Sequence, residues 1–159
     1  MSIFPTRILL ATDGSREAQL AASTAAELAN TTNSELHVLT VAPGNPDPVY
    51  HIHEGSLRYE TYQQAFEAVR EDAQKVLDEQ VKKLEEAGVS VKEAHLRLGE
   101  RRDQAIVHLA EELGAGLIVM GSRGLGGVRR ALMGSVSASV VHHAHCPVMV
   151  VRPEKERAE

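Results

Sequence analysis

The sequence predicts an α/β domain of the doubly wound, Rossmann-like type, with a five-stranded parallel sheet and about four helices on its two faces. Two observations support this prediction. Strand-like and helix-like segments alternate along the chain in the order βαβαβαβαβ, and most strand-like segments are almost continuously aliphatic. Parallel strands have this composition because right-handed crossovers cover both faces of their sheet with helices. The expected strand order is 3-2-1-4-5.

The first half of the chain is expected to hold two strands, each followed by a helix. The apolar run "RILLAT" forms the first strand, and Asp13, Gly14 and Ser15 form a turn in which Ser15 caps the next helix. Small residues recur in that helix at three- and four-residue spacing, so one face can lie close to the sheet. The second helix has an aliphatic stripe and an outer face of paired charges, and Gly88 ends it. The predicted bounds are 7–12 and 35–42 for the strands and 16–30 and about 60–87 for the helices.

The second half shows the same alternation in shorter segments. Runs such as "AGLIVM" and "PVMVV" are aliphatic, and segments of helical length separate them. The predicted bounds are 89–98, 115–121 and 147–151 for the strands and 100–113 and 135–145 for the helices.

These elements are expected to form one domain, 1–159, with a core over about residues 6–152. At 159 residues, a chain buries roughly 70% of its unfolded surface, which is enough for a core without disulfides. The proline-punctuated loop 42–59 is the place where extra function could be added without disturbing the sheet. The charged tail 153–159 is expected to be disordered.

Composition and charge exclude several classes of partner. Seventeen Lys and Arg against 22 Asp and Glu give a net charge of -5, which argues against binding nucleic acid through phosphate contacts. The single cysteine, Cys146, excludes an intrachain disulfide and fits a reducing compartment. No segment reaches the roughly 18 apolar residues of a membrane helix, and the amino end lacks a signal-peptide pattern. We therefore expect a cytoplasmic protein with neither a membrane nor a nucleic-acid partner.

The segment "GSRGLGGVRRALMGS", residues 121–135, lies between the fourth strand and the fourth helix. Ligands of open parallel sheets bind beyond the carboxyl ends of the strands, and a helix N-terminus offers unpaired N–H groups and a positive dipole end. The segment therefore predicts an anion site. Side chains that could add hydroxyl or guanidinium contacts to phosphates are Ser135, Ser137, Arg123, Arg129 and Arg130.

The glycine spacing excludes two common nucleotide motifs. A Walker A loop needs a Gly-Lys pair, which the chain lacks, and the first turn, "TDGSRE", does not match a dinucleotide fingerprint. The spacing that is present is Gly121-x-x-Gly124, nine residues, then Gly134-Ser135. With "ILLATDGS" near the amino end and "HCPVMVV" near the carboxyl end, it resembles the universal stress protein family over residues 7–152. The likeness is to the ATP-binding branch, which has the signature GxxGx9G[ST].

The resemblance implies an ATP site whose parts come from three strand ends. Adenine and ribose would lie between the ends of the first two strands, and the phosphates along the glycine segment, mostly on backbone N–H groups. Asp13 matches the family's acidic ribose ligand. The residues implied for adenine and ribose are Ala11, Thr12, Asp13 and Val41, and those implied for the phosphates are Met120, Gly121, Arg123, Gly124, Gly134, Ser135, Val136 and Ser137.

The resemblance also implies a homodimer formed through the fifth strand, Pro147 to Val151, which otherwise leaves an open sheet edge. The implied function is that of a regulatory, stress-response nucleotide-binding module. The sequence leaves open whether ATP, ADP or AMP is the resident ligand and whether Mg²⁺ accompanies it through the phosphates. It does not indicate which stress or protein partner is involved.

The alternative function is a slow ATPase or phosphotransferase that uses the same phosphate loop. Neither a second acid cluster for Mg²⁺ nor a base beside the loop is evident, and Asp13 is committed to ribose, so no catalytic residue is assigned.

Structural interpretations also exist for several of these residues. Asp13 before Gly-Ser is typical of a turn, and Arg129 and Arg130 are typical of solvated loop charges. Two histidine groups contain zinc-ligand types, but neighbouring helix residues point about 100° apart, and loop histidines are commonly solvated. No metal site is therefore assigned to either group: His142, His143, His145 and Cys146, or His51 and His53.

Overall fold

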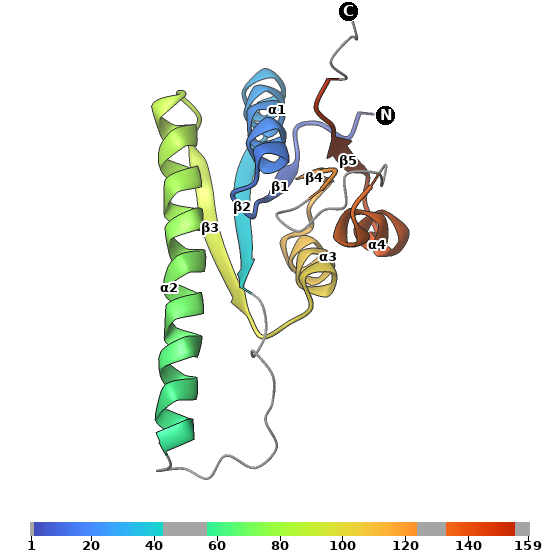
Figure 1. The fold of residues 1–159 in the computed structure, drawn as a ribbon. Coiled ribbons are helices and arrows are strands. Elements are labelled where there is room, and N and C mark those ends of the chain that lie inside the picture. Colours follow the sequence, from blue (N-terminus) through green and yellow to red (C-terminus); the bar gives the residue numbers. More distant parts are fainter. Residues whose placement is uncertain (1, 43–56, 124–132, 155–159) are drawn as a thin grey trace, which may run out of the picture.

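The computed structural model describes residues 2–42, 57–123 and 133–154, in which strands and helices alternate as predicted (Figure 1). The strands are β1 (Arg7–Ala11), β2 (Glu35–Ala42), β3 (Val91–Leu98), β4 (Leu117–Gly121) and β5 (Val148–Val151). The helices are α1 (Arg16–Thr32), α2 (Leu57–Glu86), α3 (Arg102–Leu113) and α4 (Ser135–His143). Strand β2 has the predicted bounds. The largest difference from the predicted bounds is at α2, which begins at Leu57 and not at about residue 60. Residues 43–56 of the predicted loop and 155–159 of the predicted tail lie outside the described ranges.

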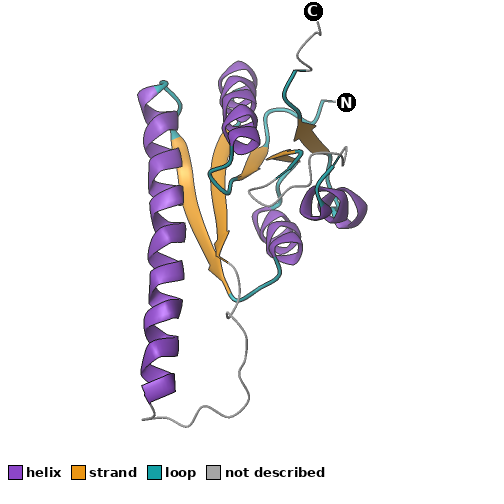
Figure 2. Cartoon of the chain, in the orientation of Figure 1, coloured by secondary structure: helices purple, strands orange, loops and turns teal. Residues whose placement is uncertain are grey.

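The strands form one parallel sheet in the predicted order, β3-β2-β1-β4-β5 (Figure 2). Leu10 of β1 lies opposite Val38 of β2 on one side and Val119 of β4 on the other. From β1 the chain therefore builds outward first to one side and then to the other. Open α/β sheets bind ligands beyond the carboxyl ends of the strands, at the point where the strand order reverses in this way.

Alternating side chains of the strands fill two hydrophobic clusters, one on each face. Ile8 and Leu10 pack with alanines of α1 and with Leu77 of α2, whereas Leu9 packs with Ile106 of α3. Helices α1 and α2 thus cover one face and α3 and α4 the other, as Figure 1 shows. The predicted doubly wound fold is confirmed.

Helix α1 packs closely against the sheet, as its alanine spacing predicts. The hydroxyl of Ser15 accepts a hydrogen bond from the Ala18 N–H at 3.2 Å and caps the helix. At the end of β4, a Cβ added to Gly121 would lie 2.8 Å from the backbone carbonyl carbon of Glu17. A glycine is therefore required at position 121 because the backbone of α1 occupies the space of a side chain.

Helix α2 is 30 residues long and buries one side, where Leu77 and Leu84 pack with residues of the strands. Its opposite side is charged and includes an ion pair between Lys82 and Glu86 at 3.9 Å. Among the described residues, no helix combines the length and apolar character needed to cross a membrane.

We expect Gly121→Ala to lower the free energy of unfolding by about 1–3 kcal/mol, because overpacking forces α1 away from β4. Gly134→Ala is the comparison, since a Cβ there meets its nearest atom at 3.3 Å and the fit needs only a small adjustment. Urea unfolding of both variants measures the difference. An equal loss in the two variants would contradict the packing explanation.

Candidate functional site

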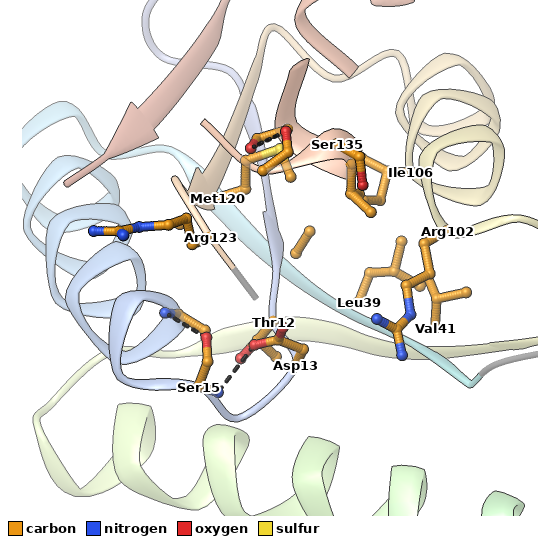
Figure 3. A pocket seen from close by; sticks show the side chains of 16 residues that line it. Thr12, Asp13, Ser15, Leu39, Val41, Arg102, Ile106, Met120, Arg123 and Ser135 are labelled. Atoms are coloured by element: carbon orange, nitrogen blue, oxygen red, sulfur yellow. Dashed lines mark hydrogen bonds between the residues drawn. The ribbon is translucent and has the colours of Figure 1, made fainter. Parts of the chain in front are cut away.

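A pocket of about 240 Å³ lies beyond the carboxyl ends of β1, β2 and β4, on the face covered by α3 and α4 (Figure 3). Its walls combine apolar side chains with a few polar groups, as is typical of small-molecule sites. The lining residues are Ala11, Thr12, Asp13, Ser15, Ala18, Leu39, Val41, Arg102, Ile106, Met120, Gly121, Arg123, Gly134, Ser135, Val136 and Ser137.

The structure brings the predicted site residues together from three separate parts of the chain. Every predicted site residue that it describes lines this pocket. Gly124 lies outside the described ranges, as do Arg129, Arg130, His51 and His53.

Hydrogen bonds hold the end of β1 rigidly at one side of the pocket. The Thr12 hydroxyl donates to Oε1 of Gln80 in α2 at 3.2 Å, and the Thr40 hydroxyl donates to the Thr12 carbonyl at 3.2 Å. Asp13 Oδ1 accepts a hydrogen bond from the Ser15 N–H at 2.9 Å. Asp13 thus has the structural role in the turn that the sequence allowed.

The N-terminus of α4 forms the other polar side of the pocket. Its N-cap is Gly134, which has no side chain to cap the N–H groups of the first turn, residues 135–137. The Gly134 N–H itself donates to the Ser122 carbonyl at 2.6 Å, and the Ser137 hydroxyl donates to the same carbonyl at 2.9 Å. The expectation that the Ser137 hydroxyl donates to a phosphate is therefore corrected, since its proton is already bonded within the protein.

The structure adds detail for two residues of the glycine segment. Gly121 lines the pocket, and its missing side chain also makes room for α1. Arg123 lines the pocket, yet Figure 3 shows its guanidinium directed away from Leu39 and Arg102.

The pocket also contains residues that sequence reasoning did not single out. They are Ser15, Ala18, Leu39, Arg102 and Ile106. Arg102 is the first residue of α3, and its guanidinium extends beside Val41 in Figure 3. The topology offered a signal for it, because a helix that follows β3 begins at the edge of the sheet where ligands bind.

Asp103, next to Arg102, joins the two helices that cover this face. Its Oδ2 accepts a hydrogen bond from the Ser139 hydroxyl of α4 at 2.6 Å and from Arg101 Nη2 at 2.9 Å. The Ser139 hydrogen bond, assisted by Arg101, holds the pKa of Asp103 below its ordinary value against the opposing effect of burial. The carboxylate therefore fixes α4, whose N-terminus lines the pocket.

The histidines near the carboxyl end do not converge on a metal site with Cys146. His143 Nδ1 lies 2.9 Å from the Ser139 carbonyl, and His145 pairs with Glu111 at 3.3 Å. Burial raises the pKa of the Cys146 thiol.

Comparisons with known proteins agree with the fold. The model of the universal stress protein family matches residues 5–152. The chain belongs to the universal stress protein family. A putative universal stress protein of Staphylococcus aureus is 33% identical over 152 residues, which are 96% of this chain and 87% of that protein.

Solved structures of other universal stress proteins have the same fold. The UspA protein of Lactobacillus plantarum superimposes with a TM-score of 0.77 at 25% identity, over 95% of this chain and all of that one. The protein of Archaeoglobus fulgidus, solved in complex with dAMP, gives a TM-score of 0.62 at 25% identity and covers 94% of this chain and 99% of that one.

We expect Asp103→Asn to lower the free energy of unfolding by about 1–2 kcal/mol at pH 7, because it removes the charge from part-buried hydrogen bonds. An aspartate in an unfolded chain has a pKa of about 3.9, and that of folded Asp103 is lower. The stabilisation is therefore fully present above about pH 3.9 and is lost as the pH falls through the lower, folded pKa.

Urea unfolding of the wild type and of Asp103→Asn between pH 7 and pH 3 checks this expectation. Asp78→Asn, on the exposed side of α2, is the matched control and should change stability by less than about 0.5 kcal/mol. A difference between Asp103→Asn and wild type that stays constant to pH 3 would contradict a role for the charge.

Proposed function

We propose that this universal stress protein binds an adenine nucleotide, with ATP as the preferred ligand, in the pocket at the carboxyl ends of β1, β2 and β4. The main support is one observation: the uncapped first turn of α4 and the Asp13 carboxylate line the same cavity. A cavity with a donor-rich end and an acceptor fits a ligand that has both phosphates and sugar hydroxyls. The dAMP complex of the Archaeoglobus fulgidus protein adds support by family likeness.

Each part of the nucleotide has a matching chemical environment. Leu39, Val41 and Met120 offer apolar surface for the adenine. Asp13, held by the Ser15 N–H, can accept hydrogen bonds from the ribose hydroxyls. The N–H groups of residues 135–137 and the positive end of α4 favour the phosphates. Arg102 adds a cation on the side of the pocket near β2.

We propose a regulatory role in stress response rather than catalysis, exercised in the cytoplasm. Preferential binding of ATP to one arrangement of the loops stabilises that arrangement, and Mg²⁺ can accompany the ligand through its phosphates. The alternative is slow hydrolysis or phosphate transfer. Incubating stoichiometric protein and ATP separates the two, because a binding module retains intact ATP for hours and an enzyme converts it steadily to ADP.

We also propose that two copies pair through β5. This strand lies at the edge of the sheet and is bonded only to β4 within the described chain. Unpaired edge strands favour association with another strand. Met149 in β5 and Val141 in α4 are exposed apolar side chains near this edge, at 36% and 47%.

We expect Ser135→Asp to weaken ATP binding at least tenfold, or about 1.4 kcal/mol, while leaving the fold intact. An acidic residue in the first turn of a helix is favourable for the helix, but it places a negative charge where the phosphates are proposed to bind. Ser135→Asn is the matched neutral control. Isothermal titration with ATP and with adenosine measures the effect, and adenosine binding should be unchanged because adenosine has no phosphate.

Other results of this titration would contradict the proposed pocket or its orientation. Unchanged ATP affinity in Ser135→Asp would exclude phosphates at α4. An equal loss of ATP and adenosine binding would indicate that α4 does not contact the phosphate end. Mass spectrometry of nucleotide released from the purified wild type identifies ATP, ADP or AMP as the resident ligand.

We expect Met149→Lys to shift the protein from dimer to monomer in sedimentation experiments, because it adds a charge to the exposed face of β5. Val148 and Val150 are less suitable positions, since both pack against the hydrophobic cluster under α3 and α4. Gln74→Lys, on the exposed side of α2, adds the same charge away from β5 and should leave the mass unchanged. A dimer that persists in Met149→Lys would place the interface elsewhere.

A further inference from the structure

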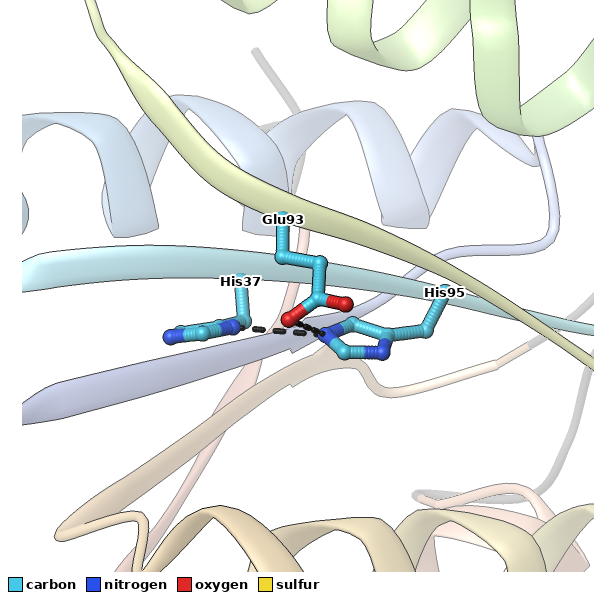
Figure 4. Close-up of side chains that lie close together, drawn as sticks. All are labelled: His37, Glu93 and His95. Carbon is cyan, nitrogen blue, oxygen red and sulfur yellow. Dashed lines mark hydrogen bonds and ion pairs between the residues drawn. The ribbon is translucent and has the colours of Figure 1, made fainter.

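Three potential metal ligands gather on β2 and β3, and none of them lines the nucleotide pocket (Figure 4). In the parallel pairing of these strands His37 lies opposite Glu93, and Leu39 lies opposite His95. Alternation along each strand therefore places the side chains of His37, Glu93 and His95 on one face of the sheet, and Figure 4 shows them pointing toward one another. His37 is near the amino end of β2, whereas Val41, which lines the pocket, is near its carboxyl end.

The distances between the polar atoms are those of ligands around one small cation. His37 Nδ1 lies 3.3 Å from His95 Nε2, and His95 Nε2 lies 3.7 Å from Glu93 Oε2. All three ligand atoms lie within 4.8 Å of one another. Zinc bonds of about 2.0–2.1 Å in a tetrahedron separate neighbouring ligand atoms by about 3.3–3.4 Å. The Glu93 side chain is exposed, and a small rotation of it would bring Oε2 to this distance from the two histidine nitrogens.

The orientation of the two imidazoles also fits a shared cation. Their ring centroids are 5.5 Å apart and their planes differ by 28°. Because the two nitrogens are much closer than the centroids, the rings meet by their nitrogen edges and not by their faces. Ring-edge nitrogens are the atoms that carry the lone pairs used in metal coordination.

His37 is buried, and one edge of its ring faces a carboxylate. The residue is 4% exposed, and its Nε2 makes no hydrogen bond with the part of the chain that the structure describes. Glu35 Oε2 lies 3.5 Å from this nitrogen, and Arg7 Nε donates a hydrogen bond to the same carboxylate oxygen at 3.2 Å. Nε2 of His37 thus faces this carboxylate, and Nδ1 faces His95.

A carboxylate behind a ligand histidine is a common arrangement in zinc sites, where it fixes the tautomer and orients the ring. Glu35 lies behind His37 in this way, on the side of the ring away from His95.

We propose that His37, Glu93 and His95 form a Zn²⁺ site through Nδ1, Oε2 and Nε2, with the fourth position open to water. Two imidazoles and one carboxylate suit a cation of intermediate softness, and three protein ligands with an open position are a known zinc arrangement. The ion would join the edge strand β3 to β2. The three ligands are not among the residues that line the proposed nucleotide pocket, so the zinc and nucleotide sites can be tested with different variants.

Zinc titration of the tag-free, full-length protein in competition with a chromophoric chelator tests this site. We expect one Zn²⁺ per chain. The zinc affinity should be at least about 100-fold weaker in His95→Gln and in Glu93→Gln, because loss of a metal ligand lowers the affinity more than loss of a residue that only hydrogen-bonds to a ligand. Zinc should also raise the unfolding temperature of the wild type and not of these variants. Glu93 is mainly exposed, so Glu93→Gln provides a variant that should fold even if His95→Gln does not.

The matched control is His145→Gln, which removes a second histidine that faces a carboxylate, Glu111, elsewhere on the surface. Its zinc affinity should equal that of the wild type. Absence of stoichiometric binding by the wild type would overturn the proposal, and would indicate that the two histidines share a proton and not a cation. Binding that survives Glu93→Gln and His95→Gln, or that disappears in His145→Gln or Cys146→Ser, would also overturn it.

Discussion

The pairing of β1 with β2 on one side and β4 on the other is the constraint on which the rest of the structure depends. It is continued past the end of β1, where the Thr12 N–H donates to the Leu39 carbonyl at 2.9 Å. Because the three strands are parallel, their carboxyl ends meet at one edge, and the polar turn after β1 faces the segment after β4. Both hydrophobic clusters are built around this pairing, since alternate residues of β1 enter one or the other. The pocket is a consequence of the topology, and its chemistry comes from the residues at the strand ends.

Several groups around the pocket stabilise the fold and shape the site at the same time. Gly121 allows α1 to approach β4, and the Ser122 carbonyl accepts hydrogen bonds from Gly134 and Ser137 at the start of α4. Asp103 fixes α4 to α3 from the far side. These contacts hold the N-terminus of α4 in place before any ligand arrives. A site that is already ordered loses less conformational entropy on binding than one that must be assembled.

The two ends of the same sheet have different electrostatic character. At the carboxyl end, uncapped N–H groups and Arg102 offer donors and positive charge, which suits an anionic ligand. Toward the amino end, Glu35 and Glu93 are close to two imidazoles, which suits a cation. The parallel arrangement produces this contrast, because every strand contributes its first residues to one end and its last residues to the other.

The order of elements, the faces they bury and an anion site at the glycine segment could be predicted from the sequence alone, because aliphatic runs, alanine spacing and glycine spacing are local patterns. Gly134 could be predicted for the same reason, since it is next to the helix end that it caps. The residues proposed for adenine and ribose, Asp13 among them, are implied by the resemblance to the universal stress protein family and not by a local pattern. The group of His37, Glu93 and His95 could not be predicted, because its members meet only after residues distant in sequence are paired. For Arg102 the topology gave a signal, but its place in the pocket depends on how α3 packs against the sheet. The tertiary structure also decided why Gly121 is a glycine and where the Ser137 proton goes. Local patterns specify elements, whereas distances between atoms of different elements depend on strand register and helix packing.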